Sequence, residues 1–324
     1  MRALLLRETT GPDGLRIGDQ PEPLASDGMV LIDVHTAGVG FVDLLVTRGE
    51  YQIAPPLPFV PGIEVAGTVR SAPAGSPLQE GDRVAATTAF GGFAEVAAAP
   101  AFTTFAIPDS MPFDVAGGFV VNHQTAHLAL VRRGRIAAGE TVLVHGGAGG
   151  VGTAAIQLAK AAGAGLVIAV ASGDRKRDLA VAAGADHAID PSEDWVARVR
   201  ELTNRRGIDL VVDPVGGERL AQSVRCMAPE ARLLVIGFAS GTIPAIDANR
   251  LLLRNVDVIG VNYGGFLLSN QAFPAQAHAD LMRWWDDGAL RPPAGECFDL
   301  ADGARALEDF AARRVTGKPV LRVR

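Results

Sequence analysis

The sequence has 324 residues, of which 48% are hydrophobic and 20% charged, and its formal net charge at pH 7 is -6. This length predicts about two domains, and the composition is that of a globular protein rather than of a disordered or fibrous one. The mildly acidic balance and the lack of an extended basic stripe argue against nucleic acid or an anionic membrane surface as the partner, which leaves a small molecule.

Apolar runs and cysteines narrow the class further. The longest mostly apolar run, residues 161–171, is too short to cross a bilayer, and the first eight residues are too short for a secretory signal, so we expect a cytoplasmic protein. The two cysteines, Cys226 and Cys297, are far apart in sequence, which excludes a disulfide scaffold and a cysteine zinc site.

The first 120 residues predict a compact, irregular β domain. Short β-like segments such as MVLIDVHTAG and IEVAGTVRSA are broken by Gly/Pro turns such as PPLPFVPG, and helical periodicity is scarce before Met111. From about residue 141 to 261, in contrast, short apolar runs alternate with amphipathic stretches. This alternation predicts βαβ units and a doubly wound parallel sheet.

A glycine-rich turn lies at the start of that second region. Gly147-Ala-Gly149-Gly150-Val151-Gly152 matches G-x-G-x-x-G, follows the strand-like TVLVH and opens the helix-like VGTAAIQLAK. An isolated match is weak, and a glycine-rich surface turn is the alternative. In this context the glycines would let a pyrophosphate approach backbone N–H groups at a helix N-terminus, so the turn predicts a dinucleotide site.

The end of the next predicted strand indicates which dinucleotide binds. Sites that prefer NAD usually carry an acidic residue there, whereas this strand ends at Ala171-Ser172 and is followed by Arg175, Lys176 and Arg177. These residues would attract a 2′-phosphate, so Ser172 and Lys176 are predicted to bind it and NADPH is favoured. Asp174 argues the other way, and a solvated first helical turn is the alternative for the basic run.

After Tyr263 the pattern predicts helices near residues 276–287 and 303–313 and a closing strand in KPVLRVR. Taken together, the chain resembles the zinc-free quinone oxidoreductase branch of the medium-chain dehydrogenase/reductase superfamily. The resemblance rests on segments spread over nearly the whole chain, namely AGVGFVDLLVTRGEYQ, LPFVPGIEVAGTV, LVRRGRIAAGETVLVHGGAGGVG, GADHAIDP, DLVVDPVGG and GKPVLRVR.

The resemblance implies an α/β fold with two domains: a GroES-like catalytic domain from residues 1–120 and 265–324, and a Rossmann NADPH-binding domain from residues 121–264. Members of the branch are commonly dimers whose Rossmann sheets join edge to edge, so a homodimer is expected. Where the zinc alcohol dehydrogenases carry Gly-His-Glu, this chain has Gly62-Ile63-Glu64, and their cysteine ligands are missing too. No metal is therefore expected, and zinc-dependent alcohol oxidation is excluded.

Without a Lewis acid, the hydride acceptor must itself spread negative charge, as a quinone or an α,β-unsaturated carbonyl does. The prediction is NADPH-dependent reduction of such an acceptor, completed by a proton from solvent or a side chain. An enoyl thioester or polyketide intermediate is the nearest enzymatic alternative. A catalytically weak NADPH-binding protein is the alternative from another class.

One departure from the family and two matches to it, all between residues 40 and 51, bear on the acceptor. Relatives often carry Asn where this chain has Gly40, which enlarges the site and removes a donor. Asp43 matches an acidic residue of the family, and its role is either catalytic or that of a hydrogen-bonded structural carboxylate. Tyr51 matches a tyrosine that borders the cleft in relatives, and a packed loop aromatic is its alternative.

The segment VNHQTAH resembles the helix start that faces nicotinamide in relatives. By this resemblance Thr125 faces the ring, His123 would donate a proton, and Asn122 would bind the acceptor oxygen, although a capping Asn and a core His are the alternatives. Further along, Phe238, Val261 and Asn262 are expected at the nicotinamide amide, and Lys318 at the phosphates. Pro191 stands where several NADPH-binding relatives have a tyrosine.

Overall fold

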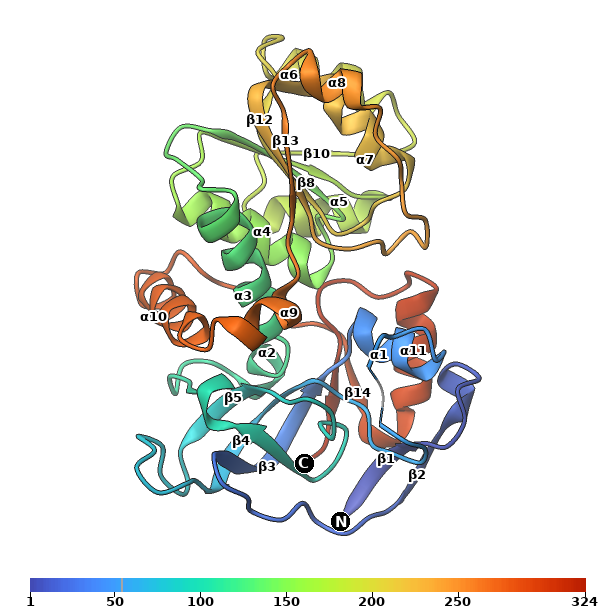
Figure 1. Ribbon diagram of the computed structural model, residues 1–324, viewed down its shortest axis with the longest axis vertical. Coiled ribbons are helices and arrows are strands. Elements are labelled where there is room, and N and C mark those ends of the chain that lie inside the picture. The colour runs from blue at the N-terminus through green and yellow to red at the C-terminus, as the bar shows by residue number, and fades with distance from the viewer. Residues whose placement is uncertain (54) are drawn as a thin grey trace. The chain divides into compact units, whose positions relative to one another are not determined.

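The computed structural model describes residues 1–53 and 55–324, and these divide into two compact units (Figure 1). The first unit comprises residues 1–121 and 293–324, so both chain ends belong to it, and the second comprises residues 122–292. The first is β-rich and the second is a doubly wound α/β unit. The α/β fold class predicted from the sequence is confirmed.

The first unit is built on a seven-stranded sheet in the order β14-β15-β3-β4-β5-β7, with β6 paired to β3, and on the separate hairpin β1-β2. Its strands are β1 (Arg2–Leu6), β2 (Leu15–Asp19), β3 (Met29–Gly38), β4 (Glu64–Ser71), β5 (Arg83–Thr87), β6 (Val96–Pro100), β7 (Thr104–Ala106), β14 (Cys297–Asp299) and β15 (Val320–Arg322). Its helices are α1 (Phe41–Thr47), α2 (Phe113–Ala116) and α11 (Gly303–Ala311), with 3₁₀ turns at Pro12–Gly14, Ala101–Thr103 and Leu300–Asp302.

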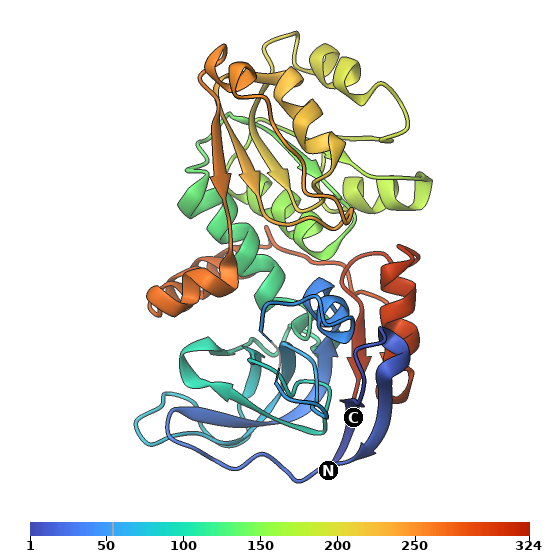
Figure 2. The same cartoon turned by 45° about the vertical axis from the view of Figure 1, so that its right-hand side comes forward.

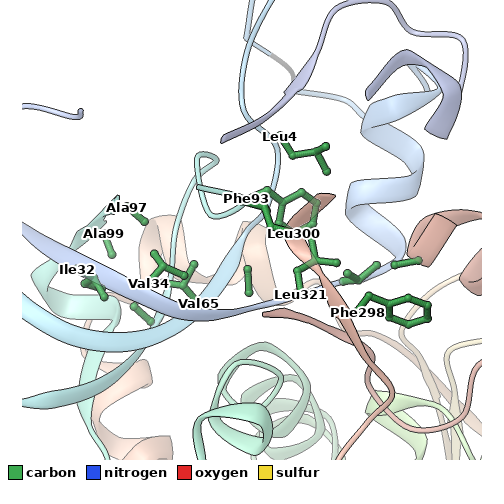
Figure 3. Packing of buried hydrophobic residues seen from close by; sticks show 14 of the residues in the cluster. Leu4, Ile32, Val34, Val65, Phe93, Ala97, Ala99, Phe298, Leu300 and Leu321 are labelled. Atoms are coloured by element: carbon green, nitrogen blue, oxygen red, sulfur yellow. The ribbon is translucent and has the colours of Figure 1, made fainter. Parts of the chain in front are cut away.

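Strand β15 returns the C-terminal segment to this sheet. It pairs antiparallel with β3, with Leu321 opposite Ala37, and Figure 2 shows the red terminal strand beside the blue one. The core below contains Leu4, Val34, Phe93 and Leu321, which come from four distant parts of the chain and lie together in Figure 3. Burial of these side chains, at about 25 cal/mol per Å² of apolar surface, fastens both chain ends to one core.

The second unit is a six-stranded, all-parallel sheet in the order β10-β9-β8-β11-β12-β13. Its strands are β8 (Thr141–His145), β9 (Leu166–Val170), β10 (His187–Ile189), β11 (Ile208–Asp213), β12 (Met227–Val235) and β13 (Asp257–Gly260). In chain order this is 3-2-1-4-5-6, the standard Rossmann arrangement, and its switch point lies between β8 and β11.

Helices precede the first of these strands, connect the strands and follow the last one (Figure 1). They are α3 (Val120–His127), α4 (Gly150–Ala161), α5 (Asp174–Ala182), α6 (Trp195–Leu202), α7 (Glu218–Ser223), α8 (Ala248–Leu252), α9 (Tyr263–Ser269) and α10 (Phe273–Asp286), with a π-helical stretch at Leu128–Arg133 and a 3₁₀ turn at Val224–Cys226. The central strands are buried on both faces, as β8 illustrates with all five residues buried, which explains their uninterrupted apolar sequences.

The second boundary between the units differs from the expected one, since residues 265–292 group with the Rossmann unit. Three polar contacts explain this grouping. Gln124 Nε2 donates to the Pro274 carbonyl at 3.2 Å, His127 Nε2 lies 3.0 Å from Asp280 Oδ2, and Gln157 Nε2 donates to the Arg291 carbonyl at 2.9 Å. Helix α10 is therefore fastened to α3, and the segment that follows it to α4.

Candidate active site

The glycine-rich turn lies at the carboxyl end of β8, the strand beside the switch point. Gly146 adopts a positive φ of 62°, and α4 begins four residues later. A Cβ at Gly152 would lie 2.1 Å from the Gly146 carbonyl oxygen, and one at Gly147 would lie 2.7 Å from the Ala169 Cβ. Only hydrogen fits at these two positions, so the turn closes tightly and presents the first N–H groups of α4, which suits a pyrophosphate.

The loop after β9 is organised by a carboxylate that the sequence analysis did not single out. Asp190, which follows β10, accepts hydrogen bonds from the Gly173 N–H at 2.7 Å and from Arg177 at 2.6 Å, and its other oxygen accepts from the N–H and hydroxyl of Ser192. The Gly173 N–H bond and the two Ser192 bonds, together with the Arg177 charge, hold the pKa of Asp190 well below its usual range. Arg177 also pairs with Asp174.

The two residues predicted to bind a 2′-phosphate flank this arrangement. Ser172 is exposed directly after β9, and Lys176 is half-buried on the first turn of α5. Arg177, in the same basic run, pairs with the carboxylates of Asp174 and Asp190.

The predicted nicotinamide residues of the second unit lie on α3 and after the last two strands. Asn122, His123 and Thr125 are all buried on α3, and the Asn122 amide nitrogen lies 2.6 Å from the position that a Cβ on Gly150 would occupy. Asn122 is thus placed beside the first turn of α4. Phe238 follows β12 and is half-buried, while Val261 and Asn262 follow β13.

In the first unit, three ionisable side chains form a buried cluster. Glu64 at the start of β4 is fully buried, and its Oε2 lies 3.1 Å from the Lys318 ammonium, while Oε1 accepts the Val121 N–H at 2.7 Å. Asp43 on α1 accepts the N–H of Gly40 at 2.8 Å and that of Gly62 at 3.2 Å. Lys318, which the resemblance predicts at the phosphates, thus has a carboxylate partner that the sequence does not indicate.

Glycines make room for this lysine. A Cβ on Gly118 would lie 2.3 Å from Lys318 Cγ, one on Gly38 would lie 2.9 Å from its Cε, and one on Gly40 would lie 3.1 Å from its Nζ. The Gly40 position, where relatives often have Asn, is therefore next to the ammonium.

Burial governs the protonation of both carboxyl groups. It raises the pKa of Asp43 to about 6, against the opposing effects of the Lys318 charge and the two backbone N–H groups. It also raises the pKa of Glu64, which Lys318 and the Val121 N–H oppose. Tyr51, the remaining predicted catalytic residue, is partly buried and packs against the hydrophobic core of the first unit.

Within residues 1–53 and 55–324, no three His, Cys, Asp or Glu side chains come together as a possible metal site. None of the helices in the described part of the chain combines the length and apolarity needed to cross a membrane.

Residues 26–109 match the family model of the alcohol dehydrogenase GroES-like domain, and residues 150–280 match that of the zinc-binding dehydrogenase. Quinone oxidoreductase-like protein 2 of Rattus norvegicus is 35% identical over 303 residues, which cover 93% of this chain and 86% of that protein. Solved structures that cover all of this chain and are themselves covered completely include the following two. They are an NADPH complex of a mycobacterial protein, at 35% identity and a TM-score of 0.92, and the quinone oxidoreductase of Thermus thermophilus, also solved with NADPH, at 35% identity and a TM-score of 0.86.

The two family models follow one another along the chain as the β-rich start and the parallel sheet do. The relatives match across both units, and the ligand motif of the zinc enzymes is replaced by Gly62-Ile63-Glu64. The chain belongs to the zinc-free quinone oxidoreductase branch of the medium-chain dehydrogenase/reductase superfamily.

Proposed function

We propose that this enzyme reduces a quinone or another conjugated carbonyl acceptor with NADPH. The observation that carries the proposal is the turn after β8, in which a Cβ at Gly152 would collide with the Gly146 carbonyl at 2.1 Å. A turn closed this tightly at the switch point of a 3-2-1-4-5-6 sheet is suited to a dinucleotide pyrophosphate. Both solved relatives described above were solved with NADPH, which supports the choice of dinucleotide.

When bound, NADPH supplies the hydride. The chain contributes binding, orientation and a proton. We assign the pyrophosphate to the N–H groups of residues 149–152, the 2′-phosphate to Ser172 and Lys176, and the nicotinamide to Thr125 and to the backbone at Phe238, Val261 and Asn262. Lys318 is assigned to the phosphates, with Glu64 holding its ammonium in place at 3.1 Å.

At the acceptor, the proposed residues are Tyr51, Asn122 and His123. Negative charge develops on the acceptor oxygen as hydride arrives, so hydrogen-bond donors aimed at that oxygen lower the barrier. The His123 imidazole and the Tyr51 hydroxyl are the groups assigned to donate the proton. The Asn122 amide, which lies beside Gly150, is suited to hold the acceptor close to the cofactor turn.

Anaerobic oxidation of NADPH tests the proposal, with a simple quinone and an enoyl thioester assayed side by side and NADH as the cofactor control. Preferred turnover of the quinone supports it. Preferred turnover of the thioester moves the enzyme to enoyl reduction. Quenching of NADPH fluorescence without oxidation in the presence of either acceptor contradicts it and indicates a catalytically weak binding protein.

We also infer a cytoplasmic homodimer joined along β13, one of the two edge strands of the parallel sheet. Val258 on this strand is 42% exposed, so the edge carries apolar surface as well as backbone groups for pairing. Leu252 and Leu253, at the end of α8 and ahead of β13 in the chain, are 76% and 79% exposed. The Val258→Lys variant should be monomeric in light scattering where the wild type is dimeric. A wild type that is itself monomeric contradicts the assignment.

A further inference from the structure

One glutamine joins three helices of the Rossmann unit. Gln124 on α3 is fully buried, and its Oε1 accepts a hydrogen bond from the Tyr263 hydroxyl at 2.8 Å. Its Nε2 donates to the Pro274 carbonyl at 3.2 Å. Both ends of the buried amide are therefore engaged, one with the start of α9 and one with the start of α10.

Tyr263 continues directly from the segment that follows β13. The Val261 N–H donates to the Val235 carbonyl at 2.9 Å, which extends the pairing of β13 with β12 by one residue. Asn262 caps α9, its side chain accepting the Gly265 N–H at 3.0 Å. The chain at Val261 and Asn262 is thus held by the sheet on one side and, through Tyr263, by Gln124 on the other.

At its other end, the hydrogen bond from Tyr263 reaches Gln124, the neighbour of Thr125. Gln124 precedes Thr125 on α3, and two residues further His127 is fastened to Asp280 of α10 at 3.0 Å. Since Thr125 lies between two tied residues, α3 cannot rotate or slide at this point without breaking one of the ties. The same connection therefore fixes both segments that we assign to the nicotinamide.

We propose that Gln124 is a positioning residue that sets the spacing between Thr125 and the Val261-Asn262 segment and so holds the nicotinamide ring for hydride transfer. This inference rests on the proposed function. It assigns the Gln124–Tyr263 hydrogen bond to the nicotinamide half of the cofactor site only. The adenosine half is bound by other elements, namely α4 and the loop after β9.

A second buried glutamine provides a matched control. Gln157 on α4 also engages both ends of its amide, with Nε2 donating to the Arg291 carbonyl at 2.9 Å and Oε1 accepting the Arg291 N–H at 3.0 Å. Gln157 thus joins α4 to the segment after α10. Gln157→Leu therefore removes a comparable pair of hydrogen bonds without touching α9.

The experiment compares NADPH with adenosine 2′,5′-bisphosphate, which carries the adenosine half and the 2′-phosphate but no nicotinamide. The variants are Tyr263→Phe, Gln124→Leu, the double variant and Gln157→Leu. In Tyr263→Phe and Gln124→Leu, we expect NADPH to bind about fivefold more weakly, as for the loss of one hydrogen bond, with binding of the bisphosphate unchanged. We expect kcat to fall about tenfold, and the primary isotope effect with deuterated NADPH to rise, because a misplaced ring slows the hydride step.

The double variant should be no worse than Gln124→Leu, because both changes break the same bond. Gln157→Leu should leave the ratio of the two affinities at its wild-type value. Equal weakening of NADPH and the bisphosphate in the Gln124 and Tyr263 variants, or no change in either, would overturn the positioning role while wild-type activity stands. A wild type that binds the bisphosphate and NADPH equally and oxidises no NADPH would overturn the proposed function and this inference together.

Discussion

The two units differ in the groups that form their polar centres. In the Rossmann unit the turn of residues 146–152 relies on the backbone, with glycines that leave N–H groups accessible at the start of α4. In the first unit the polar centre is made of charges, with Asp43, Glu64 and Lys318 brought together from α1, β4 and the segment before β15. The first arrangement comes from seven consecutive residues, and the second from residues up to 275 positions apart (318 minus 43). A glycine-rich turn of this kind can therefore be recognised in one short stretch of sequence, whereas a buried ionic cluster forms only once the fold brings distant residues together.

The largest effect is expected from breaking the ionic cluster. Lys318→Met leaves Glu64 fully buried without its cation, and loss of one partner of a buried pair typically costs about 3–5 kcal/mol. We expect a loss of that order in the free energy of unfolding at pH 8, measured by urea denaturation followed by circular dichroism. The double variant Lys318→Met/Glu64→Leu should recover part of it, since the Glu64 charge is then gone, although the buried Asp43 carboxylate still lacks the lysine. A double variant less stable than the single one would show that Lys318 does not act through Glu64.

A change in the glycine turn should weaken cofactor binding. In Gly152→Val the new side chain would overlap the Gly146 carbonyl, so the turn must open and move its N–H groups. Loss of two hydrogen bonds to a charged phosphate, each worth about 1.5 kcal/mol, should raise the Kd for NADPH by about a hundredfold. Titration of NADPH fluorescence measures this.

Gly260→Ala is the control for an added side chain, because no heavy atom of the described residues beyond Gly260 and its two chain neighbours lies within 4 Å of the position its Cβ would take. It should bind NADPH as the wild type does. Wild-type affinity for NADPH in Gly152→Val would show that the pyrophosphate does not bind at this turn.

The pH dependence of stability tests the buried Asp43 carboxyl of the first unit. Since Asp43 has a folded-state pKa of about 6 against an ordinary value of 3.8, the folded state binds its proton more tightly than the unfolded state does. Its contribution to stability is therefore fully present below about pH 4 and is lost as the pH rises through about 6. The loss amounts to about 3 kcal/mol, at 1.36 kcal/mol for each unit of the shift. Asp43→Asn should flatten this decline between pH 4 and 7 in urea denaturation, and parallel curves for the two proteins would contradict it.

The features that could be predicted from the sequence are the local ones, and those that depend on distant residues could not be. The doubly wound parallel sheet, the glycine-rich turn and the β-rich start were predicted because apolar periodicity and glycine spacing are local signals. The ionic partner of Lys318 could not be predicted, because it depends on β15 pairing with β3. Nor could the roles of Gln124 and Asp190, which lie inside the recognised segments VNHQTAH and GADHAIDP. Their importance comes from partners in other segments, Tyr263 for one and Gly173 with Arg177 for the other.

The smallest expected effect concerns two neighbouring cations with the same formal charge. Arg177 donates to Asp190 at 2.6 Å and also pairs with Asp174, so its charge is already balanced by two carboxylates. Lys176 is the cation that we assign to the 2′-phosphate. Lys176→Gln should therefore lower the preference for NADPH over NADH, as the ratio of kcat/KM, by about tenfold, which corresponds to about 1.4 kcal/mol. Arg177→Gln removes the same charge and should change that ratio less than about threefold, although it loosens the loop at Gly173. If the Arg177 variant loses more of the preference than the Lys176 variant, the 2′-phosphate is read by Arg177, and Asp190 must release it when the cofactor binds.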